Sequence, residues 1–426
     1  MFIKENQNFP TYQDSDSIEY PENEKEVSNF IKKFYKSSIP IEIIGSGSKK
    51  TIGRSIQCSK TLSLSRLSGI IEYLPEELYI KVKANTSIKL IEDKLRKNNQ
   101  QLAFEPIDFG YLLSQKSDYG TAAGQVACNI SGPRRFKAGG IRDHVLGFRG
   151  VNGRGEIIKS GGVVVKNVTG YDLCKLICGS YGTLVALTEI TFKVLPIPEE
   201  SKTLIVHNQK VERAANYLNV ASSSSNDISG AVFLPKDSKT IGCVMDVEKT
   251  FKLNDLKQDG SIIAFRVEGS KNSIDQRISN LIEELKITNI NVSVLEKNQS
   301  EIFWNKIKTL EFFYNSKNNI FRVVIPPSEC INFIYQLSNQ FSYYLDWGGA
   351  LIWVEAYELS EKMFNSIKKK VVKLGGHMMM IKNSDYLTYV EDVFTINKDR
   401  FIISQNIKKS FDPKRILNPG KMYTGI

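Results

Sequence analysis

The first half of the chain alternates helix-like and strand-like patterns of apolar residues. Val27, Phe30, Ile31 and Phe34 recur at helical spacing, which predicts a helix from Glu24 that ends before Pro40. By the same reasoning, a second helix is expected around residues 88–95, capped by Asn85 or Thr86. The remaining patterns predict strands at 41–44, 62–71, 78–82 and 186–194, and a hairpin of 145–152 and 156–160.

A domain boundary is predicted at residues 198–202, where prolines and acidic residues interrupt the apolar pattern. Beyond it, short strands and helices alternate in two rounds. Strands are expected at 204–206, 231–234, 241–245, 262–267, 320–325, 350–355 and 377–381, and helices at 211–218, 274–285, 301–313, 330–340 and 361–374. Units of this size predict one antiparallel sheet with helices on a face. Glycine is sparse here, so this part is expected to cover a site and not to build it.

Composition and charge exclude several classes of protein. The chain has 426 residues and 57 Lys and Arg against 46 Asp and Glu, a net charge of +11 that is dispersed along the sequence. This suits an anionic ligand, an acidic partner or a membrane surface, and does not by itself indicate nucleic acid. The N-terminus lacks the apolar core of a signal peptide, and no run of 18 apolar residues suggests a membrane span.

The cysteines do not suggest a metal centre. Six are scattered through the chain without a Cys-x-x-Cys pair, so neither an iron–sulfur cluster nor a zinc site is expected. We expect buried, reduced thiols of a cytosolic protein, with Cys174 and Cys178 on one helical face.

Glycine is concentrated in one stretch. Residues 120–182 hold 14 of the 29 glycines, and residues 119–135 combine glycine with alanine, serine and threonine. Such small side chains let the backbone approach a flat or anionic ligand, and successive N–H groups can bind phosphate. The alternative is a small-residue helix packed tightly on a neighbour.

A second candidate phosphate loop follows the strand at 41–44. It runs Gly45-Ser46-Gly47-Ser48-Lys49-Lys50, with backbone N–H groups, hydroxyls and a cation. It matches neither a dinucleotide-binding fingerprint nor a Walker loop. From this loop alone, a polar turn is the better interpretation.

Taken together, these blocks resemble a known family. The first loop, residues 120–135, 142–147, 166–173 and 179–184 resemble, in order and spacing, the vanillyl-alcohol-oxidase-like flavoproteins with a PCMH-type FAD-binding fold. Residues 412–421 resemble the C-terminal signature of the glycolate and D-lactate dehydrogenase branch. Within that branch the chain looks most like the smaller flavin subunits of bacterial glycolate oxidases, and Tyr181 stands where the larger catalytic subunit usually carries Glu.

The resemblance implies an α+β protein that binds FAD. A PCMH-type domain of two α+β subdomains would occupy residues 21–197, after an arm at 1–20. A ferredoxin-like α+β cap would occupy 198–400, and 401–426 would return to the FAD domain. The implied cofactor-binding residues are Gly45, Ser46, Gly47, Ser48, Lys49, Gly120, Thr121, Gly124, Ser131 and Gly132, then Pro106, Gly182 and Ile190, and at the flavin edge Asn418 and Lys421. For Asn418 and Lys421 the alternative is a helix-ending turn.

Departures from the family pattern refine this hypothesis. Many relatives attach FAD through a histidine where this chain has Ser48, which implies non-covalent FAD. The catalytic branch carries a histidine-rich metal motif, whereas this chain has only His144, His207 and His377, so no metal site is expected. The absence implies partners: a larger FAD-binding catalytic subunit with the metal motif and an iron–sulfur subunit.

Few residues are candidates for catalysis. His377 is the one candidate base, with simple packing among methionines as the alternative. His144 is expected to pack beside Arg142 and Asp143. Arg134 and Arg135 could pair with a substrate carboxylate, the pyrophosphate or a partner, and the sequence does not decide between these.

The leading functional hypothesis is an FAD-binding subunit of a glycolate (2-hydroxyacid) dehydrogenase complex that passes electrons to partners and quinone. Such a protein would be cytoplasmic, with any membrane contact peripheral and through partners, and would bind no nucleic acid. The alternatives are a stand-alone FAD-dependent oxidase or dehydrogenase of another alcohol or sugar acid, and a non-catalytic scaffold of the same fold.

Overall fold

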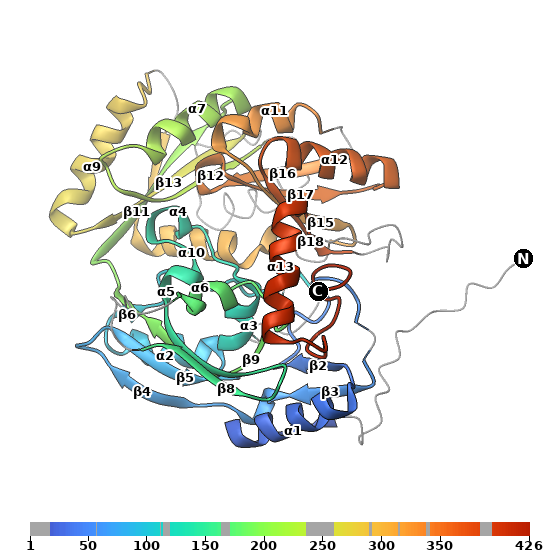
Figure 1. Cartoon of the computed structure of the whole chain (residues 1–426). Helices are drawn as coiled ribbons and strands as arrows, with labels where there is room; N and C mark the ends of the chain where they lie inside the picture. The colour runs from blue at the N-terminus through green and yellow to red at the C-terminus, as the bar shows by residue number, and fades with distance from the viewer. Residues whose placement is uncertain are drawn as a thin grey trace, which may run out of the picture.

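The computed structural model describes residues 18–56, 58–110, 112–113, 120–162, 171–235, 260–288, 292–313, 316–337, 341–383 and 394–426. The strands 241–245, part of the block 166–173, Cys243 and most of the expected N-terminal arm lie outside these residues. Figure 1 shows two layers of sheet: one built from the N-terminal half below, and a larger one from the C-terminal half above. As predicted, the fold is α+β.

The chain enters the lower layer through a helix and a small parallel sheet. Helix α1 (Glu24–Ser37) starts at Asn23, whose side chain accepts from the backbone N–H of Glu26, and it buries Val27, Ile31 and Phe34. Strand β3 (Lys60–Ser63) lies between β1 (Ile18–Glu19) and β2 (Ile41–Ile44), parallel to both. The helix and the strand at 41–44 confirm the sequence prediction.

The main lower sheet is antiparallel, with five strands in the order β4-β5-β9-β7-β8. Its strands are β4 (Ile70–Leu74), β5 (Tyr79–Lys83), β7 (Val145–Asn152), β8 (Ile157–Gly161) and β9 (Val185–Lys193). The predicted hairpin is confirmed as β7 and β8. The single strand expected at 62–71 is wrong, because a 3-10 turn η2 (Leu64–Arg66) and Gly69 at φ 120° carry the chain from one sheet to the next.

Short helices cover this sheet. They are α2 (Ile88–Arg96), α3 (Ala122–Cys128), α5 (Ile141–His144) and α6 (Leu173–Ile177), whereas α4 (Arg135–Ala138) packs against the upper layer. The caps expected for α2 are wrong: Ser87 caps it by accepting from the N–H of Leu90, while the Thr86 hydroxyl bonds to Gly69 and Lys83. Strand β6 (Gln100–Gln101) pairs with β10 (Leu195–Pro196), and the chain then leaves for the upper layer.

The upper layer is one antiparallel sheet, as predicted; in the described residues it has eight strands, which form two ferredoxin-like units. The first is β11 (Glu200–His207), α7 (Val211–Ser222), β12 (Ile228–Leu234), β13 (Ile262–Gly269), α9 (Lys271–Glu284) and β14 (Val292–Leu295). The second is β15 (Asn319–Val324), α11 (Cys330–Ile334), β16 (Phe341–Asp346), β17 (Leu351–Ala356), α12 (Glu361–Lys373) and β18 (His377–Lys382).

Both units have the same strand order. The fourth strand lies beside the first, then the third, then the second, and the units meet where β12 pairs with β16. Each therefore repeats the β-α-β-β-α-β arrangement. The helix expected at 330–340 ends earlier, at Ile334, and strand β16 was not predicted.

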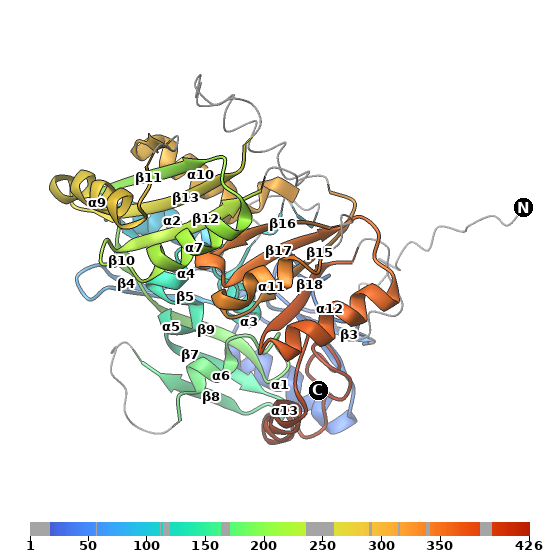
Figure 2. The ribbon, with the colours of Figure 1, turned by 90° about the horizontal axis from the view of Figure 1, so that it is seen from above.

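Two helices connect the layers. Helix α10 (Lys297–Thr309) lies between the two sheets, where Trp304 donates to Thr203 of β11 and Lys308 pairs with Glu92 of α2. Helix α13 (Lys398–Phe411) runs from the upper layer to the lower one in Figure 1, and the C-terminal residues follow it. In the view from above, α7, α9, α11 and α12 lie over the upper sheet, opposite the lower layer (Figure 2). The upper sheet thus has an inner face toward the lower layer.

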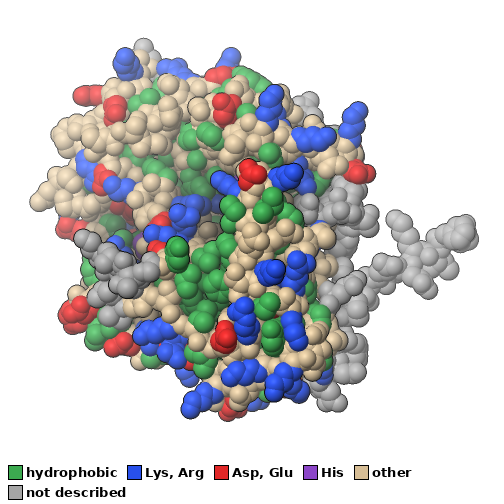
Figure 3. Space-filling view, viewed as in Figure 1, with side chains coloured by type: hydrophobic (Ala, Val, Ile, Leu, Met, Phe, Trp, Pro, Cys, Tyr) green, Lys and Arg blue, Asp and Glu red, His purple; other side chains and the backbone are tan. Residues whose placement is uncertain are grey.

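The charged side chains on the surface are relevant to the kind of partner the protein could bind. On the face shown in Figure 3, Lys and Arg side chains form small groups among acidic and apolar ones and no continuous basic patch. No helix in the described ranges is long and apolar enough to cross a membrane.

Candidate functional site

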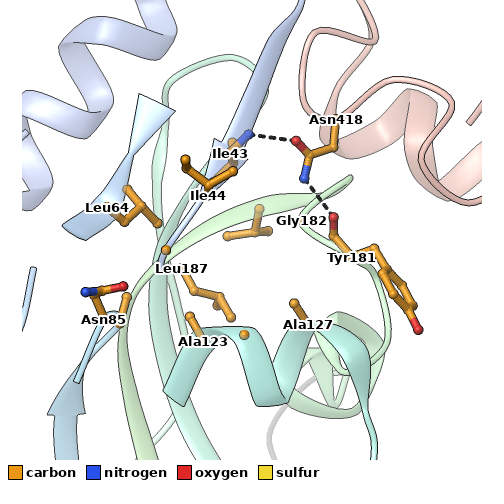
Figure 4. A pocket seen from close by; sticks show the side chains of 14 residues that line it. Ile43, Ile44, Leu64, Asn85, Ala123, Ala127, Tyr181, Gly182, Leu187 and Asn418 are labelled. Carbon is orange, nitrogen blue, oxygen red and sulfur yellow. Dashed lines mark hydrogen bonds between the residues drawn. The ribbon is translucent and has the colours of Figure 1, made fainter. Parts of the chain in front are cut away.

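Predicted loops that are far apart in the sequence line one pocket. Its walls come from the end of β2, helix α3, strand β9, the turn before β9 and the C-terminal segment (Figure 4). The lining residues are Ile43, Ile44, Gly45, Leu64, Ala84, Asn85, Ala123, Gly124, Ala127, Tyr181, Gly182, Val185, Leu187 and Asn418. Gly45, Gly124, Gly182 and Asn418 were all predicted to contact the cofactor. The pocket is apolar along most of its length, with polar atoms at its ends.

The first glycine loop approaches α3 closely. A Cβ on Gly45 would lie 2.8 Å from Oδ1 of Asn85 and 3.2 Å from Oγ1 of Thr121, so only glycine fits there. Gly47 has φ 80°, which glycine adopts without strain. Thr121 caps α3 by accepting from the N–H of Gly124. The small-residue block is thus a helix, as in the alternative interpretation, and it also lines the pocket.

Lys49 brings its ammonium group to the start of that helix. Its Nζ lies 3.7 and 3.9 Å from the points where Cβ atoms of Gly120 and Gly124 would stand, and it contacts Ser48 Oγ at 3.4 Å. Lys49 forms no ion pair with the described residues, and burial lowers its pKa. A half-buried cation without a carboxylate partner in the described residues is suited to hold a diphosphate.

The pocket also leaves an acceptor free. Oδ1 of Asn85 is buried and has no hydrogen-bond partner, although its Nδ2 donates to Ser65. A ligand hydroxyl or amino group would satisfy this oxygen. Apolar walls, a lone cation, a glycine-only approach and a free acceptor together fit FAD, which has an aromatic ring system, a polyol chain and a diphosphate.

Ser131, Gly132 and Pro106 form a second group, beneath the upper sheet. Pro106 and Ser131 make a β-bridge, and the Ser131 hydroxyl accepts from the N–H of Ile141. A Cβ on Gly132 would lie 2.8 Å from Cβ of Glu105, and the Gly132 carbonyl accepts from the indole N–H of Trp347 at 2.9 Å. This group thus joins the glycine block to the upper sheet.

The C-terminal signature closes the pocket through hydrogen bonds within the chain. Asn418 accepts from the N–H of Ile43 at 2.7 Å and donates to the carbonyl of Tyr181 at 2.8 Å. Lys421 donates to the carbonyl of Lys50 at 2.7 Å, and burial lowers its pKa. Both residues thus hold the first loop and the Tyr181–Gly182 turn in place. Their role at the flavin edge stays a prediction.

The start of the signature is fixed by a buried ion pair. Lys408 is fully buried and donates to the carboxylate of Asp412 at 2.8 Å and to the carbonyls of Thr183 and Leu417. The same carboxylate accepts from two backbone N–H groups, those of Ile416 and Leu417. This pair anchors the tail against the turn at Gly182.

Ile190 lies in the core of the lower sheet. It is fully buried on β9, between Val82 and Phe148, and does not line the pocket. His144, expected to pack, is buried against Phe104 and bonds through Nε2 to the carbonyl of Ala138.

The two neighbouring arginines have different contacts. Arg134 donates to both carboxylate oxygens of Glu268 on β13 at 2.7 and 3.0 Å, so it pairs within the chain. Arg135 lies over the ring of Trp347, with its guanidinium carbon 4.4 Å from the ring centroid. Only Arg135 therefore stays available to a ligand.

A buried ionic cluster crosses between the layers. Glu105 accepts from both Nη atoms of Arg266 at 2.8 and 3.1 Å, and Arg134 lies 3.3 Å away. Burial raises the pKa of Glu268, but Arg266 and Arg134 outweigh it and lower it to about 2. This cluster was not predicted from the sequence. Its signal was Arg266 inside the apolar strand pattern of 262–267, since a charge there needs a buried partner.

His377 faces the lower layer at the edge of the upper sheet. Its ring centroid lies 6.5 Å from that of Phe394, and Phe394 contacts Tyr181 at 5.0 Å. The Tyr181 hydroxyl bonds to Sδ of Met379, two residues after His377. Burial, then the charges of Arg322 and Arg400, lower the pKa of His377 to about 4. The imidazole is therefore neutral at physiological pH, the state that accepts a proton.

The described residues contain no group of three or more His, Cys, Asp or Glu placed to hold a metal ion. Their five cysteines, Cys58, Cys128, Cys174, Cys178 and Cys330, are unpaired, and all but Cys58 are buried.

Comparison with known proteins agrees with this geometry. Residues 16–161 match the family model described as "FAD binding domain". The protein is thus an FAD-binding oxidoreductase, and its fold is that of the PCMH-type flavoproteins: it superposes on a crystal structure of p-cresol methylhydroxylase with a TM-score of 0.70, at 15% identity, over 96% of this chain and 88% of that one.

Among curated proteins, the chain is similar to glycolate oxidase subunit GlcE of Escherichia coli. The two are 29% identical, over 91% of this chain and 93% of that protein. It is also similar to a D-lactate dehydrogenase of Archaeoglobus fulgidus, at 24% identity over 94% of this chain and 90% of the relative.

Proposed function

We propose that this chain is the FAD-binding subunit of a glycolate (short 2-hydroxyacid) dehydrogenase complex. The observation that carries the proposal is the pocket that loops at 43–45, 123–127, 181–187 and 418 form together, in a chain similar to GlcE along 91% of its length. The similarity to a D-lactate dehydrogenase supports the wider class of 2-hydroxyacid substrates.

In this proposal one set of residues binds FAD and another residue accepts the substrate proton. FAD, when bound, accepts the two electrons removed from the substrate alcohol. Lys49 would neutralise part of the charge of its diphosphate, beside the close backbone approach at Gly45, while Leu64, Val185 and Leu187 would exclude water. His377, neutral at physiological pH, accepts the hydroxyl proton.

Partner subunits complete the path of the electrons. The described residues offer no cluster of metal ligands, and the proposal assigns a metal-assisted flavoprotein and an iron–sulfur protein to the same complex, with quinone as the final acceptor. Under this proposal the chain is cytoplasmic and reaches the inner face of the membrane through those partners. Because Ser48 occupies the expected attachment position, FAD is non-covalent.

The test is the visible spectrum of the purified chain, before and after anaerobic addition of glycolate. A flavin spectrum that bleaches with glycolate, alone or after addition of the partner subunits, supports the proposal. Flavin released into the supernatant by acid precipitation supports non-covalent binding. No flavin after incubation with FAD, in protein that remains folded, would refute the cofactor assignment and leave the scaffold as the better account.

The outcome also separates this proposal from a stand-alone enzyme. Bleaching only when partners are present places the chain in an electron-transferring complex. Flavin that is never reduced by glycolate but is reduced by another alcohol or sugar acid would favour the stand-alone oxidoreductase.

A further inference from the structure

Two buried arginines of the upper sheet have similar settings but different partners. Arg266 on β13 lies over the ring of Trp304 at 4.6 Å, and Arg322 on β15 lies over the ring of Trp347 at 4.7 Å. Both are more than nine-tenths buried. Arg266 makes a two-pronged contact with the carboxylate of Glu105. Arg322 forms no ion pair with any carboxylate in the described ranges.

The guanidinium of Arg322 lacks hydrogen-bond acceptors. Its Nε and Nη2 atoms are buried and have no hydrogen-bond partner in the described part of the chain. The contact with Trp347 stabilises the charge but accepts no N–H bond. Leaving buried donors unpaired costs about 1–3 kcal/mol each, so native proteins rarely do so without a reason. Arg266 has a carboxylate partner within the chain, whereas the described residues give Arg322 none.

Nearby acidic groups do not supply it. Asp346 is the acidic side chain whose charge acts on Arg322, but its own Oδ1 accepts from the N–H of Trp347 at 2.6 Å. Burial raises the pKa of Asp346 to about 7, so it is partly protonated at neutral pH. Glu105, whose charge acts on Asp346, is occupied by Arg266 and Arg134.

Arg322 lies beside the proposed flavin pocket. In the sheet register it is opposite Met379, whose Sδ accepts from the hydroxyl of Tyr181, and Tyr181 lines the pocket. His377 lies two residues before Met379 on β18, opposite Val324 of β15. The side chains of His377, Met379 and Arg322 therefore point to the same face of the sheet. The ring of Trp347, over which Arg322 lies, also contacts the guanidinium of Arg135. Arg135 is a second cation with no ion pair in the described ranges.

We infer that Arg322 binds the carboxylate of a small carboxylic acid, with Arg135 as a second positive charge, next to the flavin pocket and His377. The inference rests on the proposed function, because it makes that carboxylate the acid group of the 2-hydroxyacid substrate. A guanidinium holds a carboxylate by two parallel N–H bonds, which fixes its orientation as well as its position. The alcohol carbon would thereby face the flavin and His377, and this subunit would bind substrate itself.

Oxalate is a suitable probe, since it is a small carboxylate that has no alcohol to oxidise. The flavin-loaded full-length chain is titrated with oxalate at constant ionic strength, and binding is followed by calorimetry and by the flavin absorbance. The variants are Arg322→Met, Arg322→Lys and, as a matched control, Arg213→Met. Arg213 also stacks on an aromatic ring, Tyr217 at 5.5 Å, but lies exposed on the outer helix α7.

Arg322→Met should weaken oxalate binding by roughly 30-fold or more, as removal of one partner of a buried charge pair does. Arg322→Lys, which keeps the charge but loses the fork, should weaken it by roughly tenfold. Arg213→Met should bind like the wild type. A thermal melt of each variant shows whether it folds, and Arg322→Lys decides the question if Arg322→Met does not.

The inference is overturned if the wild type does not bind oxalate at millimolar concentrations, or if the folded Arg322 variants bind it as tightly as the wild type does. These outcomes differ from failure of the proposed function. If the chain binds oxalate through Arg322 but glycolate never reduces its flavin, the carboxylate site is supported and the proposed reaction is refuted.

Discussion

The side-chain amide of Asn418 donates to the carbonyl of Tyr181 at 2.8 Å, across 237 residues of sequence. Tyr181 has φ 52° and the next residue, Gly182, has φ 70°, so this turn needs an external partner to hold it. A Cβ on Gly182 would stand 2.7 Å from Nδ2 of Asn418. The C-terminal tail is therefore part of the wall of the pocket, which Figure 4 shows between Ile43 and Tyr181.

Replacing Asn418 by alanine should lower the free energy of unfolding by about 1–3 kcal/mol, because the buried carbonyl of Tyr181 and the partly buried N–H of Ile43 lose their partner. FAD affinity should fall with it, since both groups belong to segments that line the pocket. Urea unfolding with and without FAD measures both effects. Asn332→Ala is the control: it removes an exposed bond to Glu329 and should change neither quantity. Unchanged FAD affinity in Asn418→Ala would show that the tail does not support the site.

Lys49→Met should weaken FAD binding by roughly tenfold to a hundredfold, the effect of losing one charge-assisted contact to a phosphate. Lys50→Met is the matched control, because the neighbouring lysine pairs with Glu42 at the surface. Fluorescence titration of the apoprotein with FAD gives both affinities.

Lys49 also predicts a pH dependence of FAD binding. Burial lowers its pKa, so it loses its charge at a lower pH than an ordinary lysine does. Affinity for the anionic cofactor should therefore decline in the alkaline range, at a pH below the usual lysine value. In Lys49→Arg, whose guanidinium stays charged, that decline should disappear. A wild-type affinity that is flat with pH would argue against contact between Lys49 and the diphosphate.

His377→Gln should slow glycolate-driven reduction of the flavin by roughly a hundredfold, the usual effect of losing a general base. The wild-type rate should fall toward acid pH with a midpoint near the pKa of about 4, where the imidazole takes up a proton. Stopped-flow absorbance of the holoprotein, with partners if they are needed, measures the rate. His207→Gln is the control, because His207 has the same lowered pKa of about 4 but bonds to Ser293 within the upper sheet. If both variants reduce flavin like the wild type, His377 is a packing residue.

Much of the fold could be predicted from the sequence because its strands and helices have clear apolar periods. Helix α1, the hairpin β7–β8 and the alternating elements of the upper layer follow such local patterns. The break at Leu64–Arg66 does not, since both sides of it are apolar. Nor does the pairing of β12 with β16, which joins the two ferredoxin-like units and depends on strands far apart in the chain.

The site could be predicted only in part. Gly45, Gly124 and Gly182 line the pocket because close backbone approach demands glycine, and that demand is visible in the sequence. The sequence could not separate Arg134 from Arg135, since which of two adjacent arginines meets Glu268 depends on the path of the chain between sheets. Ile190, at an apolar position of a strand, is core because β9 is covered on that face.

Glu105→Gln should destabilise the protein by about 3–5 kcal/mol, because it leaves the buried guanidinium of Arg266 without its carboxylate. The Glu22→Gln control breaks an exposed pair with Arg66 and should cost less than about 1 kcal/mol. Thermal and urea unfolding measure both. A loss in Glu105→Gln no larger than in the control would mean that the cluster does not hold the layers together.

Asp346→Asn should remove a pH dependence of stability. Burial raises the pKa of Asp346 to about 7, well above the unfolded value near 3.8. Between these two values the folded state binds more protons than the unfolded one. The contribution of the protonated carboxyl to stability is therefore fully present below the unfolded pKa and is lost as the pH rises through about 7. Asparagine imitates the protonated acid, and its Oδ1 can still accept from the N–H of Trp347. The variant should therefore exceed the wild type in unfolding free energy by about 2–4 kcal/mol at pH 8 and by little at pH 4, as judged by urea unfolding at both.

Because His207 and His377 titrate in both proteins, the difference between the two curves isolates Asp346. A difference that does not grow with pH would show that this carboxyl is ionised in the folded protein, and Arg322 would then have an acid partner within the chain.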